Sequence, residues 1–261
     1  MNIQELKDLQ PLVYQQFVTI LEQGRLAHAY LFSGDFASFE MALFLSQALF
    51  CQEKVGVHPC GKCRSCRLIE SNDFSDVTIV APQGNFIKTD TIRELVKNFS
   101  QSGFESSQQV FIIRDAEKMH VNAANSLLKV IEEPQSTIHI FLLTNQEEAV
   151  LPTIKSRTQI ISFPQNLPYL ERFLEEEGLL KTQASLIARL VSSQEEAKRL
   201  ATNKSFIDLL DQAKKFTELL LTDSNRAYLQ VGVLVPLAVE KAEQGRLFDV
   251  LSLLLAERLT E

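Results

Sequence analysis

The chain has 261 residues, 45% of them hydrophobic and 23% charged, which is enough for one large or two modest globular domains with cores of their own. Its 26 basic and 33 acidic residues give a net charge of −7. This acidic balance argues against a protein that wraps nucleic acid with a basic face of its own.

No segment has the composition of a membrane span or a signal peptide. The longest apolar stretch, residues 231–239, contains Pro236 and is far shorter than the roughly 20 residues that cross a bilayer. The first ten residues mix Glu5, Lys7 and Asp8 into few apolar side chains, so they lack a signal-peptide core. We therefore expect a cytoplasmic protein with no membrane partner.

Apolar runs alternate with amphipathic segments through the first 163 residues. The sequence predicts helices over residues 11–25, 41–50, 89–100 and 123–133. It predicts strands over residues 28–32, 77–80, 110–113, 138–143 and 159–163. Because several of these strands are continuous apolar runs, they are typical of strands covered on both faces. The alternation predicts a parallel, three-layer α/β sheet.

Residues 164–168 (PQNLP) interrupt this pattern, and no strand signal follows them. Beyond this break, apolar residues at helical spacing predict three short helices and then two longer ones. Their ranges are 170–177, 184–191, 195–202, 206–221 and 229–259. We expect a small helical domain followed by a second helical segment.

All four cysteines, Cys51, Cys60, Cys63 and Cys66, lie within sixteen residues. Because cytosolic thiols stay reduced, such a cluster is more often a metal site than a pair of disulfides. The two C-x-x-C steps let thiolates converge on one zinc ion, and four sulfurs leave no open position for water. We predict a structural zinc site; free or disulfide-bonded cysteines and an iron–sulfur cluster are the alternatives.

Four segments resemble, in order, motifs of the bacterial clamp-loader ATPases, a family of AAA+ proteins. They correspond to the strand and turn that lead into the phosphate loop, the helix after the Walker B strand, the sensor strand and the Ser-Arg-Cys motif. The four segments are residues 28–34, 125–134, 142–145 and 153–158. The last of them has Thr158 in place of the usual Cys.

The resemblance implies a fold for the whole chain. A RecA-like AAA+ domain would cover residues 1–163, with the zinc module at 51–66 inserted into it. An all-helical lid of three helices would cover 164–204, and 205–261 would form part of a helical collar. Because residues 205–261 have room for only two or three helices, we expect this collar to be short.

The turn that corresponds to the phosphate loop lacks the groups that bind ATP. An active loop needs glycines that free backbone N–H groups, a Lys for the β- and γ-phosphates and a Ser or Thr for Mg²⁺. Here residues 34–40 read GDFASFE, and no Lys or Arg occurs between Arg25 and Lys54. Asp35 and Glu40 place negative charge where a triphosphate would lie. We expect this chain to bind no ATP.

The position that corresponds to Walker B leads to the same expectation. It keeps Asp115 but has Ala116 where active members carry a second acid, and Glu117 comes one residue too late to replace it. We expect Asp115 to cap the turn after its strand. Thr144 of the sensor strand is expected to bond only neighbouring backbone.

Arg157 lies just before the last predicted strand. The resemblance implies that Arg157, with Ser156, faces the ATP of an adjacent subunit, where its planar fork reaches γ-phosphate oxygens. The alternative is an ordinary solvated arginine, since Lys155 beside it shows that basic residues are tolerated at this position.

The resemblance also implies a function. The chain would be a non-hydrolysing subunit of the clamp loader of the DNA polymerase III holoenzyme, which places the sliding clamp on primed DNA. Its implied partners are the delta and gamma/tau subunits, with ATP bound by neighbours. Two alternatives stay open: an active ATPase of gamma/tau type with a divergent phosphate loop, and a zinc-containing nucleic-acid-binding module, which the acidic balance disfavours.

Overall fold

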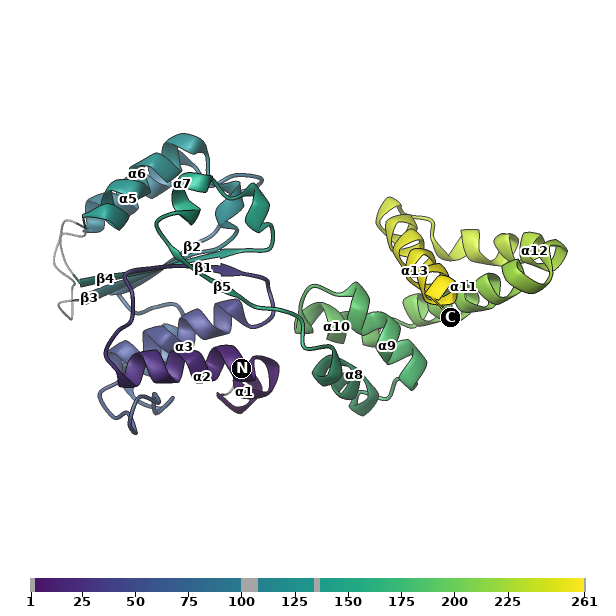
Figure 1. The fold of residues 1–261 in the computed structure, drawn as a ribbon, viewed down its shortest axis with the longest axis horizontal. Helices are drawn as coiled ribbons and strands as arrows, with labels where there is room; N and C mark the ends of the chain where they lie inside the picture. The colour runs from purple at the N-terminus through teal and green to yellow at the C-terminus, as the bar shows by residue number, and fades with distance from the viewer. Residues whose placement is uncertain (1–2, 100–107, 134–136, 261) are drawn as a thin grey trace. The chain divides into compact units, whose positions relative to one another are not determined.

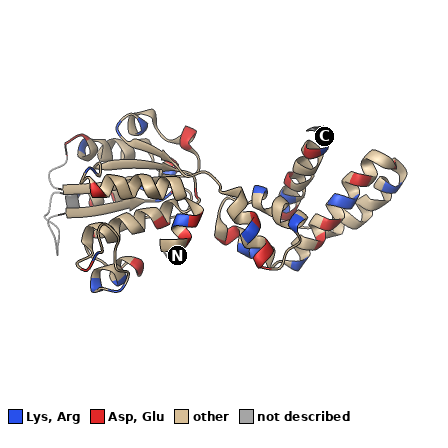
Figure 2. Cartoon of the chain, turned by 60° about the horizontal axis from the view of Figure 1, so that its bottom comes forward, with Lys and Arg blue, Asp and Glu red and all other residues tan. Residues whose placement is uncertain are grey.

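Two compact units, Met1–Gln165 and Asn166–Glu261, make up the chain (Figure 1). The structure is a computed structural model that describes residues 3–99, 108–133 and 137–260. Within these ranges, no helix combines the length and the apolar character needed to cross a membrane. Lys and Arg are interspersed with Asp and Glu along the helices of each unit (Figure 2).

The first unit is built on five parallel strands in the order β2-β3-β4-β1-β5. Every residue of β4 after its first is buried, as expected where helices cover both faces of a sheet. The strands are β1 (Ala29–Ser33), β2 (Val77–Val80), β3 (Gln108–Ile113), β4 (Thr137–Thr144) and β5 (Gln159–Ser162). Because all five run the same way, their carboxyl ends meet at one edge of the sheet.

Helices form a layer on each face of this sheet (Figure 1). One layer contains α1 (Ile3–Leu9), α2 (Pro11–Glu22) and α3 (Ser38–Phe50), with α4 (Arg64–Glu70) packed against α3. The opposite layer contains α5 (Thr89–Phe99), α6 (Val121–Glu132) and α7 (Pro152–Lys155). The predicted parallel, three-layer α/β sheet is therefore confirmed.

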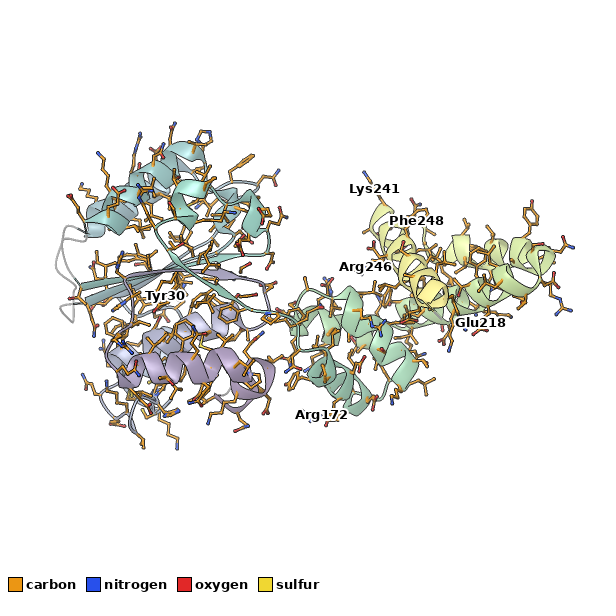
Figure 3. All side chains as sticks on the ribbon, in the orientation of Figure 1. Tyr30, Arg172, Glu218, Lys241, Arg246 and Phe248 are labelled. Carbon is orange, nitrogen blue, oxygen red and sulfur yellow. The ribbon has the colours of Figure 1, made fainter. Side chains whose placement is uncertain are left out.

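Alternate residues of the central strands fill two different cores. Phe17 of α2 packs on Tyr30 and Phe32, and these two rings pack on Phe141, with the ring centroids of contacting pairs 5.4 to 6.1 Å apart. Tyr30 lies in the interior of the unit (Figure 3). Leu31, between the two aromatic residues of β1, belongs to the aliphatic core on the other face. The alternation follows from the period of two along a strand.

The predicted helices of this unit differ from the observed ones mainly at their ends. The helix predicted over 11–25 ends at Glu22, because Gly24 has a φ of +61° and cannot continue it. The helix predicted over 41–50 begins at Ser38. Residue 100, predicted to end the next helix, lies outside the described residues. The short helices α1, α4 and α7 were not predicted.

The described part of the second unit is helical. Its helices are α8 (Leu167–Glu176), α9 (Lys181–Leu190), α10 (Gln194–Ala201), α11 (Lys204–Thr222), α12 (Ser224–Leu234) and α13 (Lys241–Thr260). Four of these helices have an N-cap residue whose side-chain oxygen accepts a hydrogen bond from a backbone N–H of the first turn. These caps are Asn166, Ser193, Asn203 and Asp223.

The single helix predicted over residues 229–259 is wrong. The structure has two helices there, α12 and α13, separated by the 3-10 turn Val235–Leu237 and three further residues. Pro236 explains the break, because proline has no N–H to donate and its ring clashes with the carbonyl of the preceding turn. α11 packs against both of the resulting helices.

Candidate functional site

The four cysteines converge from α3, α4 and the loop between them. Cys51 ends α3, Cys60 lies in the loop, Cys63 immediately precedes α4, and Cys66 lies in its first turn. All four are free thiols, and their Sγ atoms lie within 4.8 Å of one another. Sulfurs on a zinc tetrahedron are about 3.8 Å apart for bonds of ~2.3 Å. The Sγ atoms of Cys51 and Cys63 are 3.9 Å apart, which fits a four-cysteine metal site.

Backbone N–H groups donate to the sulfurs of Cys51 and Cys60 over the distances of sulfur hydrogen bonds. The N–H of Cys60 lies 3.3 Å from Sγ of Cys51, and the N–H groups of Lys62 and Cys63 lie 3.4 and 3.2 Å from Sγ of Cys60. Gly61, with a φ of +67°, allows the tight turn that directs both donors at one sulfur. N–H donors favour the thiolate, which is the form that binds metal.

Hydrogen bonding and burial shift the thiol pKa values in opposite directions. The backbone N–H of Cys66 lowers the pKa of the Cys63 thiol to about 7. Burial raises the pKa values of the Cys51 and Cys66 thiols. A divalent cation beside such thiols would offset the effect of burial by favouring the thiolate. The donor set therefore fits a bound divalent cation.

The cysteine loop is anchored to the helices beneath it. The His58 ring contacts the rings of Tyr14 and Phe44, with centroids 6.1 and 6.4 Å away. Nε2 of Gln47 on α3 donates to the carbonyl of Cys66 on α4 at 3.0 Å. These contacts fix the loop on α2 and α3 independently of the sulfurs.

The turn after β1, which corresponds to the phosphate loop, is packed by the chain's own atoms. Gly34 has a φ of +112°, and a Cβ there would lie 2.2 Å from the carbonyl oxygen of Phe163, so this approach needs glycine. Nε2 of Gln10 donates to the carbonyls of Phe36 at 3.0 Å and of Pro164 at 2.7 Å. Gln10 is only 3% exposed. Its amide thus ties this turn to the segment after β5.

The charges beside this turn are mostly acidic. Asp35 is exposed, and Glu40 is partly buried in the first turn of α3, where burial raises the pKa of its carboxyl. Arg114 brings one positive charge from the end of β3, with its guanidinium carbon 4.9 Å from the centroid of the Phe39 ring. Sequence reasoning missed this arginine because it comes from a strand distant in sequence.

Asp115 follows β3 in the left-handed conformation, with a φ of +51°, at the start of the 3-10 turn Ala116–Lys118. It occupies the N-cap position of this turn, as expected, and its carbonyl accepts the N–H of Lys118 at 2.9 Å, but its side chain makes no capping hydrogen bond. Its carboxylate instead lies 3.4 Å from Nζ of Lys118.

Thr144, at the end of β4, bonds more than the neighbouring backbone. Its hydroxyl accepts the N–H of Gln146 at 3.0 Å, as expected. It also donates to the carboxylate of Glu117 at 2.6 Å, which was not predicted. Thr144 therefore joins the end of β4 to the 3-10 turn after β3 through a side-chain hydrogen bond.

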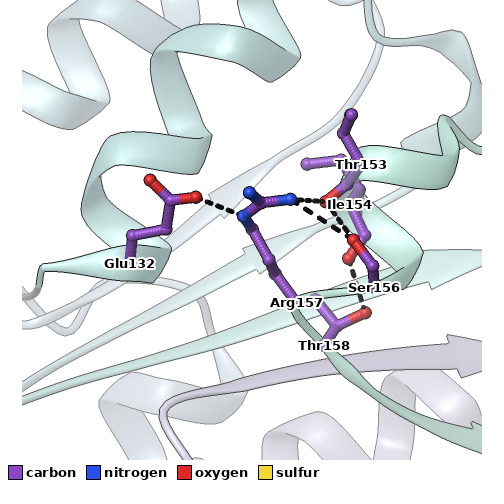
Figure 4. A network of polar contacts seen from close by, with 6 residues as sticks. All are labelled: Glu132, Thr153, Ile154, Ser156, Arg157 and Thr158. Atoms are coloured by element: carbon purple, nitrogen blue, oxygen red, sulfur yellow. Dashed lines mark hydrogen bonds and ion pairs between the residues drawn. The ribbon is translucent and has the colours of Figure 1, made fainter.

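Arg157 lies between α7 and the edge strand β5, beside Ser156 (Figure 4). Its Nη1 donates to the carbonyl of Thr153 at 3.2 Å and to Oγ of Ser156 at 3.3 Å. Its Nε forms an ion pair with Glu132, the last residue of α6. Sequence reasoning missed Glu132, although two acids at a helix C-terminus are an unusual pattern that could have drawn attention to it.

The proteins to which this chain is similar in sequence include subunits of DNA polymerase III. The profile of the family described as DNA polymerase III, delta subunit, matches residues 9–166. DNA polymerase III subunit delta' of Bacillus subtilis is 35% identical over 260 residues, which cover 98% of this chain and 79% of that protein. The delta' subunit of Pseudomonas aeruginosa is 35% identical over 160 residues, which cover 58% of this chain and 49% of that protein.

Among solved structures, a gamma subunit-related protein of DNA polymerase III from Thermotoga maritima has a similar fold. The TM-score is 0.50 at 24% identity, over 91% of this chain and 76% of that one. The profile match spans the sheet and all four cysteines, and the B. subtilis relative extends the likeness through the helical unit. The chain therefore belongs to the family of DNA polymerase III delta' subunits.

Proposed function

We propose that this chain is a clamp-loader subunit that does not hydrolyse ATP and that helps the DNA polymerase III complex place the sliding clamp on primed DNA. The packed turn after β1 carries this proposal. Gln10 bonds the backbone of that turn, and Asp35 and Glu40 lie beside it in place of a phosphate-binding Lys. A triphosphate would have to displace the amide and then meet two carboxyl groups, which is electrostatically unfavourable.

The chain's contribution to hydrolysis in the complex is Arg157, acting in trans on the ATP of a neighbouring subunit. Its side chain is 39% exposed and lies before the edge strand of the sheet, which supports access to a partner. Ser156 helps to hold the guanidinium at that edge. An arginine provides two parallel N–H donors for phosphate oxygens, a geometry that lysine lacks.

The metal held by Cys51, Cys60, Cys63 and Cys66 is a structural zinc ion. The four sulfurs and the N–H donors around them support this assignment. Four cysteine ligands fill the coordination shell, so the ion has no position for a substrate or an activated water. Its role is to hold the loop between α3 and α4.

The helical unit serves as lid and collar, with residues 164–204 as the lid and 205–261 as the collar. Large apolar side chains exposed on α12, on α13 and on the segment between them support a subunit interface in the collar. They are 60 to 79% exposed and comprise Tyr228, Leu229, Val235, Val239 and Phe248, the last of which is labelled in Figure 3. The delta and gamma/tau subunits are the proposed partners.

Co-expression of the tagged chain with the delta and gamma/tau subunits of the same organism tests this function. We expect one complex that hydrolyses ATP faster when the clamp and primed DNA are added, and a slower rate when this chain is left out. Failure to co-purify, with the folded chain alone turning over ATP in the presence of Mg²⁺, would instead support an independent ATPase.

A further inference from the structure

We propose that Glu132 is the counter-ion that holds Arg157 in a resting position, from which a phosphate group must displace it. This inference rests on the proposed action of Arg157 in trans and adds a regulatory residue to it. In this proposal Glu132 sets a threshold for the action of Arg157. The guanidinium group gives up its intrachain ion pair only to an anion that competes with the Glu132 carboxylate.

The hydrogen bonds of the guanidinium group carry the argument (Figure 4). An arginine grips a phosphate bidentately through one of two edges, Nε with Nη2 or Nη1 with Nη2. Nε is paired with Glu132, and Nη1 donates to Thr153 and Ser156. Nε has a single hydrogen, so a phosphate can use the Nε–Nη2 edge only after Glu132 has released it, and the Nη1–Nη2 edge already carries two bonds on Nη1.

The position of Glu132 is unfavourable for its own helix. Glu132 ends α6, and Glu133 follows as its C-terminal cap, so two carboxylates lie where the helix dipole is negative. Basic side chains are the stabilising choice at this end, and Lys129 supplies one. A glutamate at this position does not stabilise the end of its own helix. The ion pair with Arg157 provides a favourable interaction that accounts for its presence.

The ion pair is weak enough to be reversible. The side chains of Arg157 and Glu132 are 39% and 47% exposed, so water screens their attraction. A triphosphate offers several anionic oxygens at once, which makes it a stronger partner than a single carboxylate. Thr153 and Ser156 accept hydrogen bonds from Nη1 of the guanidinium group. These bonds keep the group at the sheet edge when the ion pair with Glu132 breaks.

NMR of the isolated chain tests the resting contact itself, using the N–H signal of Arg157 Nε. In the unaltered chain we expect this proton to exchange slowly with water, and in Glu132→Gln to exchange at least severalfold faster. Glu133→Gln is the matched control, because it removes the same charge one residue away. Equal exchange in the Glu132→Gln variant and the unaltered chain would overturn the inference.

ATP hydrolysis by the reconstituted complex, measured without clamp or DNA, tests the threshold. Glu132→Gln should raise this rate about twofold to fivefold, the range that the loss of an exposed ion pair allows. Glu133→Gln should leave the rate unchanged, and Glu132→Gln combined with Arg157→Ala should match Arg157→Ala alone.

An unchanged or lower rate with Glu132→Gln, while Arg157→Ala does lower it, would overturn the threshold and leave the proposed function intact. An unaffected rate with Arg157→Ala would remove the proposed action of Arg157 in trans, and the threshold with it.

Discussion

At the scale of single residues, one amide organises the turn after β1. Gln10 lies at the junction of α1 and α2, and its side chain bonds carbonyls 26 and 154 positions away in sequence. Both bonds come from Nε2 of a side chain that water hardly reaches. The turn therefore owes its shape to the protein rather than to a bound nucleotide.

Gln10→Ala should lower the free energy of unfolding by about 1–3 kcal/mol, because it leaves the carbonyls of Phe36 and Pro164 without their donor. Gln4→Ala is the matched control, since Gln4 is exposed and, among the described residues, its side chain bonds Asp8 of its own helix. It should change stability by less than about 0.5 kcal/mol. Urea unfolding of the isolated chain measures both, and equal values for the two variants would contradict the role of Gln10.

Glu40 should make stability depend on pH. Burial raises the pKa of its carboxyl in the folded chain, so folding is favoured most below the pKa of the unfolded chain and less as pH rises through the folded value. Glu40→Gln removes the carboxyl that must ionise. Relative to the unaltered chain, the variant should gain thermal stability at about pH 8 and little at about pH 4. Exposed Glu22→Gln controls for charge removal alone, and an equal gain at both pH values would exclude this mechanism.

At the scale of elements, the cysteine loop is a module added to a sheet that does not need it. The strands come from segments outside residues 51–66, and His58 and Gln47 anchor the loop without using the sulfurs. Metal binding should thus order the module locally and contribute little to the sheet.

Elemental analysis of chain purified without chelator should give one zinc per molecule. Cys60→Ser should reduce zinc to well under one per chain and speed proteolysis between α3 and α4. Ser71→Ala, just beyond α4, is the control and should keep the metal. Circular dichroism should show the same helix and strand content in both variants. Zinc retained in full by Cys60→Ser would remove this cysteine from the site.

The sequence predicted elements well where a strong local pattern was present. β2 matches its predicted bounds, and the other strands lie within two residues of theirs, because buried parallel strands are uninterrupted apolar runs. α1, α4 and α7 have four to seven residues, too few for helical periodicity to stand out. The helix over 229–259 failed because apolar spacing outweighed the break at Pro236.

The candidate sites were predictable where the chemistry is local in sequence. Three of the four cysteines come in C-x-x-C steps, and Ser156 and Arg157 belong to one short motif, so spacing and resemblance identified them. The contacts of Gln10, and of Glu132 with Arg157 25 positions away, join residues distant in sequence. Such pairings depend on how helices pack on the sheet, which residue patterns do not encode.

At the scale of the whole molecule, Arg157→Ala separates folding from function. The Arg157 side chain is half-exposed and takes part only in surface bonds, so the variant should keep its zinc and its stability within about 0.5 kcal/mol. An arginine in trans is worth about 10³ to 10⁵ in rate in single-site NTPases, and several ATP sites in one complex should dilute the loss. Clamp- and DNA-stimulated hydrolysis by the reconstituted complex should therefore fall. Unchanged hydrolysis, with the variant confirmed in the complex, would make Arg157 an ordinary surface residue.

The central claim, that this chain serves the clamp-loader complex without a nucleotide of its own, is tested most directly by calorimetric titration of the isolated chain with ATP and Mg²⁺. The packed turn and the missing loop Lys predict no heat of binding up to millimolar ATP. Saturable binding with a sub-millimolar Kd would contradict the account and assign the chain its own nucleotide site.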